Sequence, residues 1–241
     1  MNFIEAVSPN FNERTVPPDI IVLHYTGMQT GEAALERLCD PEAKVSSHYL
    51  VEEDGRVFRL VAEERRAWHA GLSFWKGETD INGRSIGIEI VNPGHEFGYR
   101  PFPQAQIDAV IELLSDIRSR WQIEDARIIA HSDVAPARRN DPGELFPWKI
   151  LAQAGHGLWV EPDAAPGAPL AEGEEGAGVF ALQAGLTRLG YDCAPSGKFD
   201  AETATVLRAF QRHWRQEKID GVADGMTRAR LIALLRAAAG A

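Results

Sequence analysis

The run Ile20-Ile21-Val22-Leu23-His24 decides the fold class of the N-terminal part of this 241-residue chain. Its four apolar residues come shortly after Pro17-Pro18 and stop at a histidine. The run is too short for a helix and rich in β-branched residues, so it predicts a buried strand at the centre of a sheet. A second short run, Arg127-Ile128-Ile129-Ala130, also stops at a histidine, His131. It predicts a second core strand.

Other strands and helices are predicted between and beside these two runs. Residues 47–52 and 56–60 flank Asp54-Gly55, a strong signal for a β-hairpin. Residues 85–91 alternate with period two, which indicates another strand. Pro103 opens a stretch in which apolar residues recur at helical spacing up to about Trp121. Because strands and helices interleave, we predict an α/β fold with a mixed central sheet flanked by helices.

The composition changes near residue 160 and divides the chain. Residues 160–176 are mainly Pro, Ala, Gly and acidic residues, with almost nothing to bury. We therefore predict a domain over residues 1–158, a linker over 159–177 and a small domain over 178–241. Three helices are expected in the small domain, one along the stripe of Val179, Leu182, Leu186 and Leu189, and two over residues 203–214 and 227–238.

Charge and hydropathy exclude two classes of function. Lys plus Arg is 25 and Asp plus Glu is 35, so the net charge is −10. That balance argues against nucleic acid as a partner, because such binding depends on basic surfaces. No apolar run approaches the roughly 18 residues that a membrane span needs. The N-terminus has neither the basic nor the apolar region of a signal peptide, which favours the cytoplasm, with the cell envelope or periplasm as the alternative location. We also expect a monomer.

Three side chains are candidate metal ligands. His24 and His131 end the two predicted core strands, and Asp141 follows in the loop Arg139-Asn140-Asp141-Pro142-Gly143. Two imidazoles and a carboxylate leave zinc an open position, as in catalytic sites. Each residue alone has an ordinary alternative, since a histidine at a strand end can simply pack and an Asp before Pro-Gly is a common turn residue.

Other polar residues have both a functional and a structural interpretation. Glu89 stands in the alternating apolar strand, where it is either a solvent-facing residue or a general base that passes a proton to the leaving nitrogen. Trp68 and His69 could line a substrate groove or be ordinary buried residues. His48 begins the predicted hairpin strand, so a structural hydrogen bond is its alternative role.

Five ordered motifs together resemble a known family, the type 2 N-acetylmuramoyl-L-alanine amidases, which include the anhydro-muropeptide recycling amidases and are related to the peptidoglycan recognition proteins. The motifs span most of residues 18–150 and are Ile21-Val22-Leu23-His24-Tyr25-Thr26, Ser47-His48-Tyr49, Ala67-Trp68-His69-Ala70-Gly71, Ser85-Ile86-Gly87-Ile88-Glu89, and His131-Ser132-Asp133-Val134-Ala135-Pro136 with Asp141-Pro142-Gly143. The order of all five makes the resemblance far more specific than any single motif.

The resemblance implies a zinc enzyme of the bacterial cell wall. It implies Zn²⁺ on the two histidines and Asp141, Glu89 as the catalytic carboxylate, and hydrolysis of the lactyl amide between N-acetylmuramic acid and L-alanine. It assigns Trp68 and His69 to the substrate groove, and the neighbouring motifs add His48 and Tyr25. The family usually has Lys where this chain has Arg139. Arginine there can still stabilise an oxyanion but will hardly donate a proton.

The C-terminal part resembles the type 1 peptidoglycan-binding domain. The resemblance lies in Leu182-Gln183, Leu189-Gly190-Tyr191, Gly197-Lys198-Phe199-Asp200, Phe210-Gln211 and Asp220-Gly221. It implies peptidoglycan or muropeptide fragments as partners. Two other functions stay open from the sequence: a non-catalytic wall-binding or sensing protein, and a zinc carboxypeptidase that cuts stem peptides. The sequence also leaves open whether the substrate is the intact wall or soluble anhydro-muropeptides.

Overall fold

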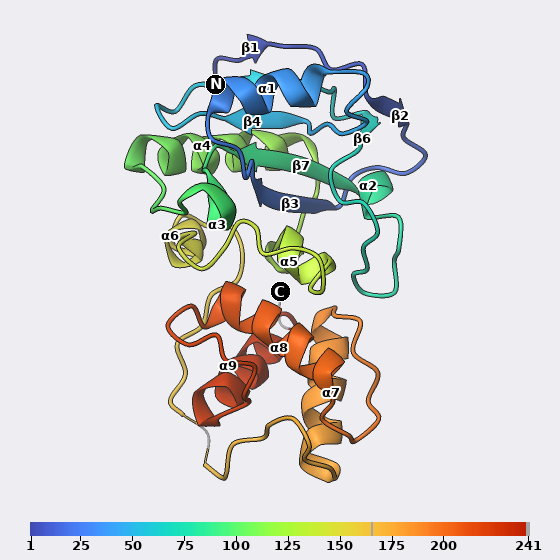
Figure 1. Cartoon of the computed structure of the whole chain (residues 1–241), viewed down its shortest axis with the longest axis vertical. Coiled ribbons are helices and arrows are strands. Elements are labelled where there is room, and N and C mark those ends of the chain that lie inside the picture. The colour runs from blue at the N-terminus through green and yellow to red at the C-terminus, as the bar shows by residue number, and fades with distance from the viewer. Residues whose placement is uncertain (165, 240–241) are drawn as a thin grey trace.

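A mixed sheet forms the centre of the N-terminal part of the computed structural model, which describes residues 1–164 and 166–239 (Figure 1). In spatial order the six strands are β1 (Ile4–Glu5), β5 (Val57–Arg59), β4 (Tyr49–Val51), β7 (Ser85–Ile90), β3 (Ile20–Tyr25) and β8 (Ile128–Ala130). Strands β4, β7, β3 and β8 run parallel, and β5 pairs antiparallel with β4 as the predicted hairpin. A separate antiparallel pair joins β2 (Phe11–Glu13) to β6 (Arg65–Ala67). The predicted α/β class is confirmed.

Helices cover both faces of this sheet. Those of the N-terminal part are α1 (Gly31–Cys39), α2 (Ile81–Arg84), α3 (Gly94–Phe97), α4 (Gln104–Arg120), α5 (His131–Val134) and α6 (Trp148–Gln153), with a 3₁₀ turn, η1 (Asp125–Arg127). Alternate residues of strand β3 point to opposite faces of the sheet and pack in different apolar clusters. Ile21 and Leu23 pack in one cluster with the buried residues of α4, whereas Ile20 and Val22 belong to the cluster on the other face. Both sides of β3 are therefore apolar, which is why the sequence run has no polar alternation.

The predicted three-helix unit is present at the C-terminal end of the chain. It consists of α7 (Ala177–Leu189), α8 (Ala201–Trp214) and α9 (Gly225–Ala237), which lie together at one end of the molecule (Figure 1). Two buried glutamines hold its loops in the same manner. Gln183 accepts from the Gly197 amide and donates to Thr203, and Gln211 accepts from the Gly221 amide. The amides of Gly197 and Gly221 are thereby fixed against the helix that precedes each loop.

The C-terminal helices share an apolar core with the sheet. Ile20, Val22 and Ile129 belong to the same buried cluster as Leu186 and Phe210. Within the stretch predicted as a linker, Leu170 pairs with Ala223, and Trp159 and Val160 pack against that cluster, as does Leu158 just before it. The division at residues 158 and 177 stays a prediction. None of the helices in the described ranges combines the length and the apolar character that a membrane crossing requires.

Candidate metal centre and active site

The register of the parallel strands brings the predicted site residues to one sheet edge. His24 on β3 lies directly beside Glu89 on β7, and Leu23 lies beside Ala130 on β8. His131 follows Ala130 and opens α5 at the same edge. The carboxyl ends of parallel strands meet at one edge, so residues far apart in sequence become neighbours.

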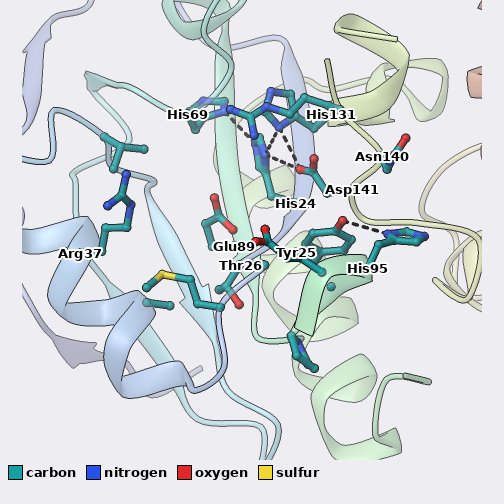
Figure 2. A pocket seen from close by; sticks show the side chains of 18 of the residues that line it. His24, Tyr25, Thr26, Arg37, His69, Glu89, His95, His131, Asn140 and Asp141 are labelled. Carbon is teal, nitrogen blue, oxygen red and sulfur yellow. Dashed lines mark hydrogen bonds and ion pairs between the residues drawn. The ribbon is translucent and has the colours of Figure 1, made fainter. Parts of the chain in front are cut away.

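Two imidazoles and one carboxylate converge at this edge (Figure 2). Nδ1 of His24 lies 2.9 Å from Nδ1 of His131 and 3.1 Å from Oδ2 of Asp141. His131 Nδ1 lies 2.9 Å from the same carboxylate oxygen. Ligand atoms around a tetrahedral zinc are roughly 3.3 Å apart at bond lengths of about 2.0 to 2.2 Å. The donor set, nitrogen, nitrogen and oxygen, therefore fits a metal ion of this kind.

The loop that carries Asp141 is tied back to the helix of His131. The backbone amide of Ser132 donates to the backbone carbonyl of Asp141 at 3.0 Å, and all three candidate ligands are buried. Burial, and next the charge of His131, lower the pKa of His24 to about 4. Burial alone would raise the pKa of Asp141, but His131 and His24 together hold it well below its ordinary value. The site thus favours a neutral His24 imidazole beside an ionised Asp141 carboxylate, which are the forms that bind metals.

Glu89 presents an unpartnered carboxylate oxygen at the same place. Its Oε2 atom is buried and has no hydrogen-bond partner within residues 1–164 and 166–239. Burial, and next the charge of Asp141, raise the pKa of Glu89 well above its ordinary value, while Arg139 acts in the opposite direction. A carboxyl with a raised pKa beside a candidate metal site is suited to take up a proton and release it again during a reaction.

A cavity of about 390 Å³ opens over these residues. Its lining includes Glu89, Tyr25 and His69, together with the cationic side chains Arg37 and Arg139. Figure 2 shows that the labelled side chains surround one common space. Of the residues that the sequence predicted for substrate contact, Tyr25 and His69 reach this cavity.

The other two predicted substrate residues lie outside the cavity lining. Nδ1 of His48 accepts from the Gly87 amide at 2.9 Å, and its Nε2 lies 3.1 Å from the carbonyl of Arg65. Trp68 donates through its indole nitrogen to Asn12 at 2.6 Å. Both side chains connect strands in this structure, and their contact with substrate stays a prediction.

One cavity residue was missed at the level of sequence. His95 stands in the short helix α3, where no local pattern marks it, yet its Nδ1 lies 3.0 Å from the hydroxyl of Tyr25. Its other ring nitrogen lies 3.1 Å from a carboxylate oxygen of Glu144. Only the loop packing brings these three side chains together, so no sequence signal was available for them.

Comparison with known proteins agrees with this geometry. Residues 14–144, more than half of the chain, match the family described as N-acetylmuramoyl-L-alanine amidase. The chain belongs to the N-acetylmuramoyl-L-alanine amidase family. Residues 175–231 of this amidase match a second family, described as a putative peptidoglycan binding domain. The amidase is therefore a hydrolase of amide bonds. We call the C-terminal segment that matches the second family, residues 175–231, the accessory domain.

Several relatives resemble the amidase over most of its length. N-acetylmuramoyl-L-alanine amidase AmiD of Escherichia coli is 40% identical over 238 residues, which cover 90% of this chain and 82% of AmiD. The structure of AmiD with the substrate anhydro-N-acetylmuramic acid-L-Ala-D-gamma-Glu-L-Lys superposes with a TM-score of 0.79 at 39% identity, covering 92% of this chain and 90% of that one. AmpDh3 of Pseudomonas aeruginosa in complex with anhydromuramic pentapeptide has a TM-score of 0.79 at 32% identity, covering 95% and 97%.

Proposed function

We propose that this amidase uses zinc to hydrolyse the lactyl amide bond between N-acetylmuramic acid and L-alanine in anhydro-muropeptides. The observation that carries the proposal is the convergence of His24, His131 and Asp141 beside Glu89, whose buried Oε2 has no hydrogen-bond partner among the residues that the structure describes. The AmiD and AmpDh3 structures with bound anhydromuramic peptides support this choice of substrate. A zinc ion on the three ligands would polarise the scissile carbonyl and lower the pKa of the attacking water.

Glu89 moves the proton in this mechanism. Its carboxylate takes a proton from water as the oxygen attacks the lactyl carbonyl carbon, and a new C–O bond forms. The same carboxyl then gives the proton to the nitrogen of L-alanine as the C–N bond breaks. The second proton of the water passes from the new carboxyl group to the amine, so the products are a lactyl carboxylate on the sugar and a peptide ammonium group, and no other reactant is required.

Arg139 supplies positive charge next to the reacting carbonyl. Its side chain lines the cavity, and its charge lowers the pKa of Glu89. We assign it to stabilisation of the oxyanion that forms on the carbonyl oxygen. The C-terminal helices are proposed to bind peptidoglycan, while the monomeric state and the cytoplasmic location stay predictions.

The test is release of peptide from anhydro-muropeptides by the purified full-length protein. We expect His24→Ala and Glu89→Ala to abolish release while circular dichroism shows a folded protein. Mass spectrometry of the products separates the alternatives, because an amidase removes the whole stem peptide and a carboxypeptidase removes one D-alanine. Wild-type activity in both variants would refute the mechanism. A product that lacks only the terminal residue would replace it with the carboxypeptidase.

A further inference from the structure

The segment Trp68-His69-Ala70-Gly71 lies directly behind both imidazoles of the candidate metal centre. Nε2 of His24 lies 3.0 Å from Nδ1 of His69. Nε2 of His131 lies 3.1 Å from the backbone carbonyl oxygen of Ala70. The consecutive residues His69 and Ala70 therefore contact the Nε2 atoms of His24 and His131, while the Nδ1 atoms of the two ligand rings face each other. Figure 2 shows the contacts that run from His69 through His24 to His131 and Asp141.

A chain of hydrogen bonds determines which nitrogen of His69 carries hydrogen. Ser85 has one hydroxyl hydrogen and donates it to the carbonyl of Ile81 at 2.6 Å. The Ser85 oxygen lies 3.2 Å from Nε2 of His69, so in this contact the hydroxyl accepts and Nε2 donates. A neutral imidazole has one donor and one acceptor nitrogen. Nδ1 of His69 is therefore the acceptor and takes the Nε2 hydrogen of His24.

The same reasoning fixes both candidate ligands in one tautomer. His24 donates through Nε2 to His69, and His131 donates through Nε2 to a carbonyl oxygen that can only accept. The Nδ1 atoms of both rings are then lone-pair acceptors, and they meet an oxygen of the Asp141 carboxylate. Three acceptors face one another within 4.8 Å, an arrangement that a cation stabilises.

Two further residues hold the segment in place. The side-chain oxygen of Asn82 accepts from the backbone amides of His69 and Ala70, at 3.0 and 2.8 Å. Gly87 on β7 leaves room for the imidazole, because a Cβ atom there would lie 2.5 to 2.7 Å from ring atoms of His69. His69, Asn82 and Ser85 are all buried. These contacts explain why the Gly in the Ser-Ile-Gly-Ile-Glu strand cannot carry a side chain.

We propose that His69 is a positioning residue of the metal centre, which sets the tautomer of His24 while the Ala70 carbonyl sets that of His131. The proposal rests on the proposed function, because it concerns the same metal centre. It adds that His69 and Ala70 act on the reaction through the two ligand histidines, in addition to any contact of His69 with substrate. The partner of a ligand histidine orients the ring and strengthens its metal bond, and its loss typically lowers metal affinity about 10- to 100-fold.

The first test is the tautomeric state of the wild-type protein. Two-bond ¹H–¹⁵N correlation spectra of the zinc-loaded protein report which imidazole nitrogens carry hydrogen. We expect Nε2–H on His24, His69 and His131. A hydrogen on Nδ1 of His69, or none on Nε2 of His24, would overturn the proposal. This measurement needs no variant and no substrate.

The second test measures affinity for Co²⁺ by its visible absorption after zinc has been removed. We expect His69→Leu to weaken Co²⁺ binding about 10- to 100-fold, and His69→Gln, which keeps an acceptor oxygen, to recover part of the loss. His156→Leu is the matched control, because His156 is also a buried, hydrogen-bonded histidine but contacts Ser115 and Arg118 instead. Unchanged Co²⁺ affinity in His69→Leu, or equal losses in the His69→Leu and His156→Leu variants, would overturn the proposal.

The two tests are independent of the amidase reaction. A protein with the expected tautomers and the expected loss of Co²⁺ affinity, but without peptide release, would refute the proposed function and leave the role of His69 intact. Should His69→Leu fail to fold, the wild-type spectra still decide the tautomers.

Discussion

Nδ1 of His213 lies 2.6 Å from a carboxylate oxygen of Asp133, a contact that joins the C-terminal helix α8 to the short helix of His131. The hydroxyl of Tyr191 donates to the other oxygen of Asp133 at 2.5 Å. Asp133 and His213 are each 1% exposed, and the His213 ring stacks on Trp148 with a centroid distance of 3.7 Å. The accessory domain is thus attached through a buried polar cluster that lies next to the metal centre.

Loss of this cluster should destabilise the whole chain. We expect His213→Ala to lower the free energy of unfolding by about 3–5 kcal/mol, because it removes one of the hydrogen-bond partners of the buried Asp133 carboxylate and leaves a cavity beside Trp148. Tyr191→Phe removes one hydrogen bond and should cost about 1–3 kcal/mol. Urea unfolding followed by tryptophan fluorescence measures both. Arg56→Ala, which breaks an exposed ion pair with Asp54, should leave the midpoint unchanged.

The shared core also predicts a single unfolding transition. Ile20 and Val22 of the sheet pack in one cluster with Leu186 of the C-terminal helices, so the core on this face of the sheet is complete only when both parts are folded. Calorimetry of the full-length protein should show one peak. Two separated peaks would contradict this view of the accessory domain as an integral part of the fold.

Zinc should stabilise the folded protein as well as activate it. Binding to the native state alone adds about 2.7 kcal/mol when free zinc is 100 times its Kd. For a chain of this size that should raise Tm by roughly 5–10 °C over the chelator-treated protein. His24→Ala removes a ligand, and its Tm should no longer respond to zinc. An equal response in both proteins would place the metal elsewhere.

The acid side of the pH profile should report Glu89. A general base works only when ionised, and burial raises the pKa of Glu89 well above its ordinary value. The kcat/KM should therefore fall on acidification at a pH well above about 4.3, the ordinary value for Glu. Glu89→Gln should lower kcat about 10²- to 10⁴-fold. The residual activity of this variant should no longer show the fall in kcat/KM on acidification, which we call the acid limb. A limb near pH 4 in the wild type would contradict the assignment.

Substitution of Arg139 should change both rate and pH dependence. Arg139→Gln removes a charge that lowers the pKa of Glu89, so the acid limb should move to higher pH. Loss of oxyanion stabilisation should lower kcat about 10²- to 10³-fold. Arg139→Lys keeps the charge and should retain most of both properties. An unshifted limb in the Arg139→Gln variant would show that the two side chains do not interact.

Two Gly→Ala substitutions distinguish a glycine that leaves room for a neighbouring side chain from a glycine in an open position. Gly87→Ala forces a Cβ into the His69 ring and should cost about 1–3 kcal/mol, measured by urea unfolding. Gly178→Ala is the comparison. Gly178 lies in helix α7, where an added Cβ would contact only Leu170, at an ordinary distance of 3.6 Å. It should be neutral or stabilising by up to about 1 kcal/mol. Equal effects at the two positions would contradict the close packing of His69.

Much of the site could be predicted because two of its candidate ligands lie at the ends of strands that the sequence reveals as short apolar runs. His24 and His131 each end a short apolar run, and Asp141 follows within one loop. Their convergence is confirmed by the distances between their ligand atoms. The partners of the imidazoles could not be predicted in this way. His69 has the same local pattern whether it faces substrate or His24. Ser85 belongs to one of the five motifs, but neither Ser85 nor Asn82 shows a pattern that predicts its contact with His69.

The sequence by itself determined the α/β class, the strands near residues 20–23, 47–60, 85–91 and 127–130, and the set of candidate ligands, because these follow from hydrophobic period and residue type over short distances. The short strands β1, β2 and β6 were not predicted. Only the tertiary structure decided that His69 stands behind His24 and that Asp133 binds the C-terminal helices. Those contacts depend on the register of the parallel strands and on packing between segments many residues apart, and local sequence patterns predict neither of these.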